Sequence, residues 1–158
     1  MIERVVHPYQ LEKALSHVIA NKGSAGVDGI SIREIRKIFT EKKLQFIEQI
    51  KTEKYQVQPI LGIEIPKGNG KTRLLGIPTT TERVLQQSVA QNLAPLFEPE
   101  FKPNSFGFRP NKNARQAVGQ AREYIHQGLN HIAHTDLKNF FDEVDHCLLL
   151  NLVYQKVK

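Results

Sequence analysis

The sequence predicts an α+β protein in which helices pack on a small antiparallel sheet. Apolar residues recur at helical spacing in several segments, whereas residues 55–77 are rich in β-branched side chains around a Gly-rich turn signal. The length of 158 residues, with 40% hydrophobic and 24% charged residues, is typical of one globular domain with its own core.

Charge and composition narrow the classes of protein. The formal net charge of +6 favours a polyanionic partner, although a surface kept soluble by its charge explains it equally well. Cys147 is the only cysteine, which excludes a disulfide framework and a cysteine metal site. The start, MIERVVHPYQ, lacks the apolar core of a signal peptide, and no run approaches the roughly 20 apolar residues that span a bilayer. By elimination we expect a cytoplasmic protein with no membrane partner.

Two helices are predicted before residue 55. The first carries one apolar stripe and stops near Gly23; its stripe consists of Leu11, Ala14, Leu15, Val18 and Ile19. The Gly-rich loop GSAGVDG follows. Ser31 and Glu34 in SIRE form a capping-box pattern that starts the second helix, for which we expect a break near Thr40.

Residues 60–77 predict a β-hairpin, because KGNGK is a turn signal between two strand-like runs. A regular turn would place Lys67, Lys71 and Arg73 on one face, which would suit a triphosphate, although basic hairpin tips are also common on protein surfaces. The string GKT does not make a phosphate-binding P-loop, because Ile65 stands where that motif needs glycine and a strand follows instead of a helix.

The remaining elements alternate between capped helices and loops. TTTE at residues 79–82 starts a helix with Leu85, Val89, Leu93 and Leu96 on one side, and the prolines at 95, 99 and 103 end it. A helix capped by Asn113 is closed by Gly128, the stretch HIAHTDL reads as a buried strand, and Asp145 opens a last helix.

The loop SFGFRPNKN sets two aromatic rings beside basic side chains. Phe106 and Phe108 lie next to Arg109 and Lys112, and such groups can stack on bases and hold phosphates. The residues alone favour the alternative that both phenylalanines anchor the loop in the core.

The stretch HTDLKNFFDEVDH concentrates four carboxylates around a Phe-Phe pair. Lys138 and Phe141 occupy positions that an EF-hand reserves for ligands and glycine, so calcium binding is disfavoured, whereas spacing alone leaves a glycosidase pair open. Asp136 at a strand end, with a neighbouring backbone carbonyl, fits Mg²⁺ better. A metal-dependent nuclease would need further ligands, and the nearby histidines at 131, 134 and 146 lack a known ligand spacing.

Five segments together resemble bacterial group II intron reverse transcriptases, also called intron maturases. The segments are GSAGVDGIS, IPKGNGKTRLLGIPT, TERVLQQSVAQNLAPLFEPEF, SFGFRPNKNARQAV and DLKNFFDEVDH, in the family's order. The resemblance implies the fingers and the beginning of the palm of a right-hand polymerase. We expect residues 1–54 to be an N-terminal helical extension, residues 55–130 the fingers with the basic hairpin, and residues 131–158 the start of the palm.

The resemblance also implies roles for individual residues. Asp136 matches the catalytic aspartate that binds Mg²⁺ together with the carbonyl of Leu137, and Phe141 matches the residue under the sugar of the incoming dNTP. Lys67 and Arg73 match fingers residues that contact its triphosphate. The RNA-binding residues that we expect are Gly23, Ser24, Gly26, Lys71, Arg109 and Lys112.

The chain departs from the family in one respect, since no Tyr-Ala-Asp-Asp string occurs in it. We therefore expect a piece of an RNA-directed DNA polymerase that does not polymerise by itself. Its expected partners are intron or template RNA, a DNA primer and dNTP, and an exposed apolar palm surface would also allow a homodimer. The alternative is a non-catalytic RNA-binding module of a splicing maturase.

Overall fold

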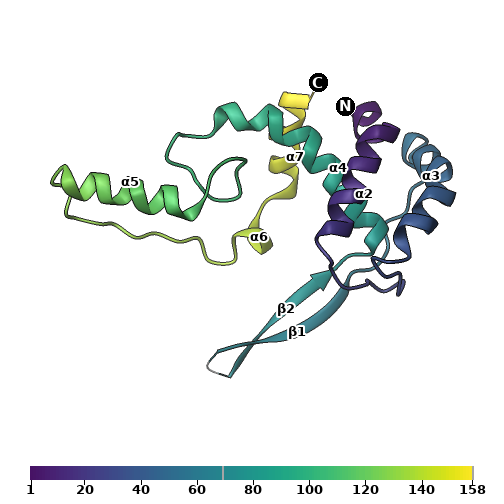
Figure 1. The fold of residues 1–158 in the computed structure, drawn as a ribbon, viewed down its shortest axis with the longest axis horizontal. Helices are drawn as coiled ribbons and strands as arrows, with labels where there is room; N and C mark the ends of the chain where they lie inside the picture. Colours follow the sequence, from purple (N-terminus) through teal and green to yellow (C-terminus); the bar gives the residue numbers. More distant parts are fainter. Residues whose placement is uncertain (69, 158) are drawn as a thin grey trace. The chain divides into compact units, whose positions relative to one another are not determined.

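The computed structural model describes residues 1–68 and 70–157. Asn69 of the predicted turn and Lys158 at the end of the predicted palm segment lie outside the described residues. The chain divides into two compact units, Met1–Leu93 and Ala94–Lys158, and each is considered by itself (Figure 1).

The class is α+β, as predicted. The elements of the first unit are α1 (Ile2–Val5), α2 (Pro8–Ala20), α3 (Ile35–Lys51), β1 (Leu61–Lys67), β2 (Lys71–Ile77) and most of α4 (Thr80–Phe97). The second unit continues through the 3₁₀ turn η1 (Glu98–Glu100) to α5 (Ala114–His126), α6 (Phe140–Glu143) and α7 (His146–Val157).

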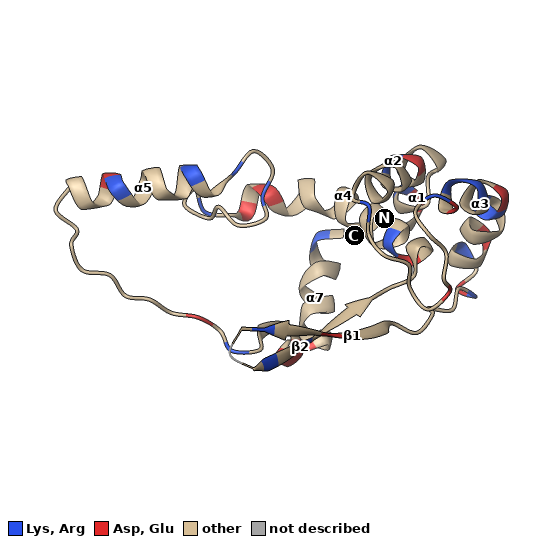
Figure 2. Cartoon of the chain, turned by 60° about the horizontal axis from the view of Figure 1, so that its bottom comes forward, with Lys and Arg blue, Asp and Glu red and all other residues tan. Residues whose placement is uncertain are grey.

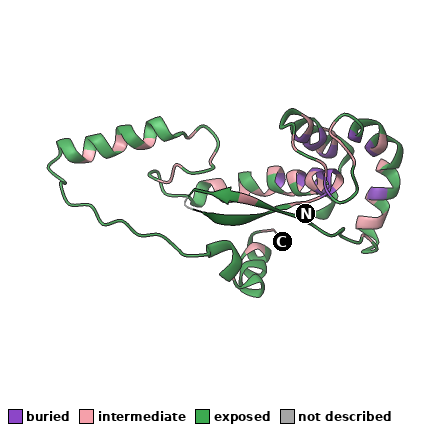
Figure 3. Ribbon diagram, turned by 90° about the horizontal axis from the view of Figure 1, so that it is seen from below, coloured by how far each residue is buried: buried purple, intermediate pink, exposed green. Residues whose placement is uncertain are grey.

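The core of the first unit lies between α2, α3 and α4. The stripe predicted for α2 is buried at Leu11, Ala14, Leu15 and Val18, and these residues form one cluster with Ile35, Phe39, Phe46 and Val84. Figure 3 shows the buried positions gathered in these helices, with the hairpin exposed. The described core includes no strand residue, so the expectation that helices pack on the sheet is wrong for this unit: they pack on one another.

Helix α3 begins later than the SIRE pattern suggested. The carboxylate of Glu34 does reach back, accepting hydrogen bonds from the backbone N–H of Ser31 at 3.2 Å and from its hydroxyl at 2.5 Å. Regular helix starts only at Ile35. The break expected near Thr40 is absent, because the Thr40 hydroxyl donates to the carbonyl of Arg36, at 2.7 Å, within one continuous helix.

Helix α4 buries a different stripe from the one predicted. Thr79 caps it, since its hydroxyl accepts from the backbone N–H of Glu82 at 3.2 Å. The buried face is mostly polar and comprises Thr80, Glu82, Val84, Ser88 and Asn92, while the predicted apolar stripe is half-buried. Polar burial is tolerated because the groups are bonded: the Ser88 hydroxyl donates to the carbonyl of Val5 at 2.6 Å. Pro95 lies inside the helix and does not end it.

In the second unit two predicted helix starts are confirmed, and one predicted strand is absent from the described residues. Asn113 and Gln116 form a reciprocal capping box at the start of α5, and Gly128 follows its end with a φ of +87°. The carboxylate of Asp145 accepts from the backbone N–H of Leu148 at 3.0 Å as α7 begins. Residues 131–137, expected to be a buried strand, are exposed and unpaired, with Ile132 84% exposed. A strand needs a hydrogen-bonded neighbour, and the described residues offer none here.

None of the described helices combines the length and the apolar character needed to cross a bilayer.

Candidate nucleic-acid interface

The hairpin register places three cations on one face. Lys67 pairs with Lys71, and Ile65 pairs with Arg73, so positions 67, 71 and 73 point to the same side of the ribbon. All three side chains are exposed, and none forms an ion pair within the described part of the chain. Figure 2 shows basic residues in both strands close to the turn. The prediction that alternation gathers these cations is confirmed.

The opposite face of the hairpin carries no basic residue among those described. It presents Gly62, Glu64 and Pro66 from β1 and Thr72, Leu74 and Gly76 from β2. Like charges directly opposite one another destabilise a β-ladder. The facing pair Lys67 and Lys71 therefore favours an anion at this position, because an anion would relieve the repulsion.

Two of the three glycines of GSAGVDG closely approach other parts of the chain. A Cβ on Gly26 would lie 2.7 Å from the Cα of Thr79, and one on Gly23 would collide with the guanidinium of Arg83. That guanidinium also donates to the carbonyl of Ser24, and to the hydroxyl of Thr80 at 3.0 Å. Close packing of the loop on the start of α4 thus explains Gly26 without any ligand, whereas the contact at Gly23 is with the end of a flexible side chain.

A basic hollow adjoins this loop. Its volume is about 970 Å³, and it is lined by Ile19, Lys22, Gly23, Ser24, Ala25, Ser31, Ile32, Arg33 and Arg36. Arg36 is engaged with Glu12 at 2.6 Å, whereas Lys22 and Arg33 have no ion-pair partner among the described residues. Sequence reasoning missed these two cations, although Lys22 directly precedes GSAGVDG and Arg33 lies within SIRE, two motifs that it identified.

Arg109 organises the loop between η1 and α5. Its guanidinium donates to the Glu98 carboxylate at 2.7 and 3.1 Å and to the carbonyls of Lys102 and Ser105 at 2.8 and 2.7 Å. Its side chain is only 9% exposed, and it lies 5.0 Å from the centre of the Phe101 ring. These contacts occupy most of its donors, so the geometry supports a positioning role, and the RNA contact expected for Arg109 stays a prediction.

The two phenylalanines of SFGFRPNKN behave differently. Phe106 is half-buried, with the Lys112 ammonium 5.2 Å from its ring centre. Phe108 is fully exposed and has a φ of +53°, which is unusual for a bulky side chain. The interpretation of both rings as core anchors is therefore wrong for Phe108. Lys112 also donates to the carbonyl of Pro103 at 3.3 Å.

Asp136 lies in the second unit, in the unpaired segment before α6. Its carboxylate accepts from the backbone N–H of Leu137 at 3.0 Å, and it lines a shallow hollow of about 420 Å³ with Thr135, Leu137 and Phe140. Phe141 is 87% exposed, and its ring centre lies 5.5 Å from that of Phe140.

Oxygen donors are the ligands that Mg²⁺ prefers, and the Asp136 carboxylate and the Leu137 carbonyl are of that kind. These two groups could supply only part of an octahedral shell. In the described residues no group of three or more His, Cys, Asp or Glu side chains is placed to hold a metal ion.

Comparison with known proteins identifies the family. Residues 65–157 match the family Reverse transcriptase (RNA-dependent DNA polymerase). The group II intron-encoded protein LtrA of Lactococcus lactis subsp. cremoris is 33% identical over 147 residues, which is 92% of this chain and 24% of LtrA. Protein YkfC of Escherichia coli K12 is 27% identical over 170 residues, covering 99% of this chain and 43% of YkfC.

A third relative is the putative COX1/OXI3 intron 2 protein of Saccharomyces cerevisiae, 30% identical over 140 residues, or 87% of this chain and 15% of that protein. The chain belongs to the reverse transcriptase family. The resemblance to group II intron-encoded reverse transcriptases and maturases is confirmed. The chain spans less than half the length of these relatives.

Proposed function

We propose that this chain is the part of an RNA-directed DNA polymerase that holds template RNA and the incoming dNTP. The observation that carries the proposal is the single face of the hairpin on which Lys67, Lys71 and Arg73 gather, within a region that matches the reverse transcriptase family. In this proposal residues 1–54 are a helical extension, residues 55–130 the fingers and residues 131–158 the start of the palm.

The hairpin face contacts the triphosphate of the dNTP. The planar guanidinium of Arg73 can donate two parallel hydrogen bonds to one phosphate group, whereas the ammonium of Lys67 acts as a compact point charge. Two exposed cations with no carboxylate partner in the described residues keep their charge available for such an anion.

Asp136 and the carbonyl of Leu137 hold part of the shell of a Mg²⁺ ion, which neutralises phosphate charge during nucleotidyl transfer. Phe141 lies under the sugar and disfavours a 2′-hydroxyl; its full exposure leaves the ring free for that contact. A single carboxylate is insufficient for two metal ions, so the chain by itself does not extend a primer. In a protein with the complete polymerase domain, Asp136→Ala abolishes DNA synthesis and leaves RNA binding nearly unchanged.

RNA is held by basic groups in both units. Lys22 and Arg33 add two cations to the hollow beside Gly23, Ser24 and Gly26, and Lys71 and Lys112 contact phosphates of the template or of the DNA primer. Arg109 shapes the loop that carries Lys112. This distribution also supports the alternative function, a splicing maturase module that binds intron RNA without catalysis. The basic hollow that holds Lys22 and Arg33 does not include Asp136, so RNA binding there does not depend on the catalytic residue.

Salt dependence tests the RNA-binding part of the proposal. The probe is a fluorescent RNA template annealed to a DNA primer, and fluorescence anisotropy gives its affinity at several NaCl concentrations. Lys71→Ala and Lys112→Ala should each reduce the slope of log affinity against log salt by about 1, because each removes one phosphate contact. Lys13→Ala, on the exposed side of α2, serves as the control and should leave the slope unchanged. A slope that all three variants share with the unmodified chain would refute these contacts.

Primer extension separates the two candidate functions. The same template and primer are incubated with Mg²⁺ and dNTPs, either with this chain or with a protein carrying the complete domain. We expect no product from the chain and Asp136-dependent product from the complete protein. Extension by the chain alone would refute its inactivity, and a complete protein that binds RNA without extending the primer would establish the maturase module.

A further inference from the structure

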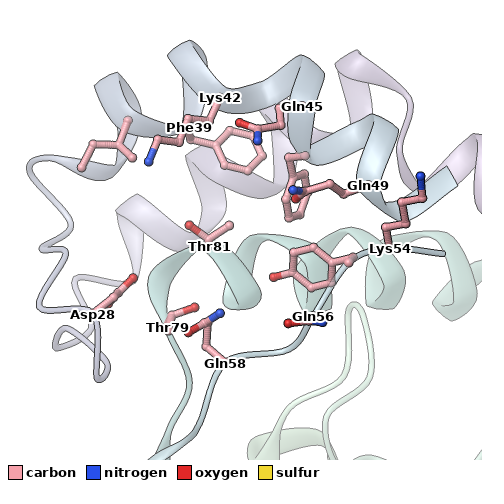
Figure 4. Close-up of a pocket in the computed structure, with 13 residues that line it drawn as sticks. Asp28, Phe39, Lys42, Gln45, Gln49, Lys54, Gln56, Gln58, Thr79 and Thr81 are labelled. Carbon is pink, nitrogen blue, oxygen red and sulfur yellow. The ribbon is translucent and has the colours of Figure 1, made fainter. Parts of the chain in front are cut away.

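A second hollow in the first unit lies between α3 and the start of α4, and Figure 4 shows its lining. Its volume is about 430 Å³. Three aromatic side chains, Phe39, Phe46 and Tyr55, line it. The Phe46 ring meets those of Phe39 and Tyr55 edge to face, with ring centres 5.3 and 5.2 Å apart. Phe39 and Phe46 belong to the buried core, 3% and 5% exposed, so the half-buried Tyr55 is the ring that this wall presents to a ligand.

Four glutamine amides surround these rings. Gln45 and Gln49 come from α3, while Gln56 and Gln58 come from the segment that leads to β1 (Figure 4). In the described part of the chain none of the four side-chain amides has a hydrogen-bond partner. Each amide can both donate and accept, so together they present an adaptable polar edge beside an aromatic surface.

Two lysines complete the lining. Lys42 and Lys54 lie toward opposite ends of the hollow in Figure 4, and neither forms an ion pair with a described residue. Asp28 is the only acidic residue in the lining. Cations on either side of an uncharged polar and aromatic centre suit a ligand with a planar, hydrogen-bonding middle and an anionic group at each end.

The buried carboxylate of Glu82 fixes one wall. One of its oxygens accepts from the backbone N–H of Gln58, and the other is buried without a hydrogen-bond partner in the described residues. Glu82 is 4% exposed and belongs to α4, so this bond ties the extended segment around Gln58 to the start of that helix. The hydrogen bond to Glu82 therefore holds the backbone of Gln58 in a defined position.

We propose that this hollow receives a single unpaired nucleobase of an RNA strand. The half-buried Tyr55 ring stacks on the base, the amides bond its Watson–Crick edge, and Lys42 and Lys54 contact the phosphates on its two sides. An RNA strand has a phosphate on each side of a base and therefore accounts for both lysines. A free nucleotide carries its phosphate on one side only. The volume is in the range of small-molecule sites. The inference rests on the proposed RNA binding and assigns a recognition site within it.

Two RNA hairpins with the same stem test this inference, one fully paired and one with a single bulged adenosine. Fluorescence anisotropy measures the affinity of the chain for each. We expect about a tenfold preference for the bulged hairpin, the size of one stacked and hydrogen-bonded base. Gln45→Leu/Gln49→Leu should reduce the preference, because it removes two hydrogen-bonding amides and keeps the stacking ring, without weakening binding to the paired hairpin. Gln86→Leu, an exposed glutamine of α4 outside this lining, is the matched control and should retain the preference.

The outcomes are distinguishable. Equal binding of both hairpins by the unmodified chain overturns the base site but leaves RNA binding intact, whereas binding of neither overturns the proposed function as well. An undiminished preference in the double variant also overturns the site. If an equal concentration of AMP displaced the bulged hairpin, the hollow would be a site for a free nucleotide, and the proposal that it binds an RNA strand would be wrong. Unchanged affinity for the paired hairpin in the double variant shows that it is folded.

Discussion

Lys67 and Lys71 are direct partners across the β1–β2 ribbon, so two positively charged side chains leave the same face of the ribbon at the same level. Because the two like charges repel one another, Lys71→Gln tests whether this pair serves RNA binding at a cost in hairpin stability. The substitution should stabilise the hairpin by about 0.2–1 kcal/mol because a like-charge pair is removed. It should also weaken binding of an RNA template–primer.

Hydrogen exchange of the hairpin amides and anisotropy of the labelled duplex measure the two effects. Lys13→Ala is the control for the loss of one positive charge. If Lys71→Gln lowered both the protection of the hairpin amides from exchange and the affinity for RNA, Lys71 would stabilise the hairpin. The interpretation that the charge pair serves RNA binding at a cost in stability would then be wrong.

Gly26 is expected to be essential for packing of the GSAGVDG loop. A Cβ there would lie 2.7 Å from the Cα of Thr79, a backbone atom that cannot rotate away. Gly26→Ala should therefore lower the free energy of unfolding by about 1–3 kcal/mol, the usual cost of overpacking.

Urea denaturation followed by circular dichroism measures this change. Gly119→Ala is the matched control, because Gly119 lies within α5 and an added Cβ would meet no atom within 4 Å. The control should be neutral or stabilising, since alanine favours helix. Equal stability of the Gly26 variant and the unmodified chain would contradict the close approach.

Arg109 should act through the shape of its loop. Arg109→Lys removes the paired donors that reach Glu98 and two backbone carbonyls, and we expect a loss of about 1–3 kcal/mol in the stability of this region. Hydrogen exchange of residues 98–112 locates the effect.

The exposed Arg115, which has no ion-pair partner among the described residues, is the control, and Arg115→Lys should leave exchange unchanged. An Arg109→Lys variant with native exchange rates and weakened RNA binding would instead identify Arg109 as a direct RNA contact.

Glu34 should give a pH-dependent contribution at the start of α3. The Ser31 hydroxyl, followed by the Ser31 backbone N–H, lowers the pKa of Glu34 because both donate to the carboxylate. The contribution to stability is present above the unfolded-state pKa and is lost as the pH falls through the lower folded-state pKa.

An NMR titration of the Glu34 carboxyl carbon measures the pKa directly. Ser31→Ala should raise it toward the ordinary value by removing the hydroxyl donor. A titration midpoint that is identical in both proteins would show that the hydroxyl does not act on Glu34.

Local signals in the sequence predicted the features that depend on neighbours along the chain. The apolar stripe from Leu11 to Val18 and the shared face of Lys67 and Arg73 follow from helical or strand periodicity, and the Asn113 cap follows from its residue type at a helix start. The family resemblance was equally recoverable, because it rests on contiguous motifs.

Features that depend on distant contacts were missed. Glycine is needed at position 26 because Thr79, more than fifty positions away, packs against it, and the buried Ser88 and Thr80 of α4 donate to the carbonyls of Val5 and Ile30. Residues 131–137 have strand-like composition, but pairing needs a partner that periodicity cannot supply. The aromatic hollow joins α3, the start of α4 and the segment before β1, so no single stretch of sequence reveals it.

The most direct measurement of nucleotide binding by the hairpin is equilibrium dialysis of radiolabelled dATP with Mg²⁺. We predict that Lys67→Ala/Arg73→Ala weakens dATP binding by about tenfold or more, because charge-assisted phosphate contacts are lost, while Lys13→Ala has no effect. Equal dATP affinity in the unmodified chain and the double variant would contradict a triphosphate site on this face of the ribbon.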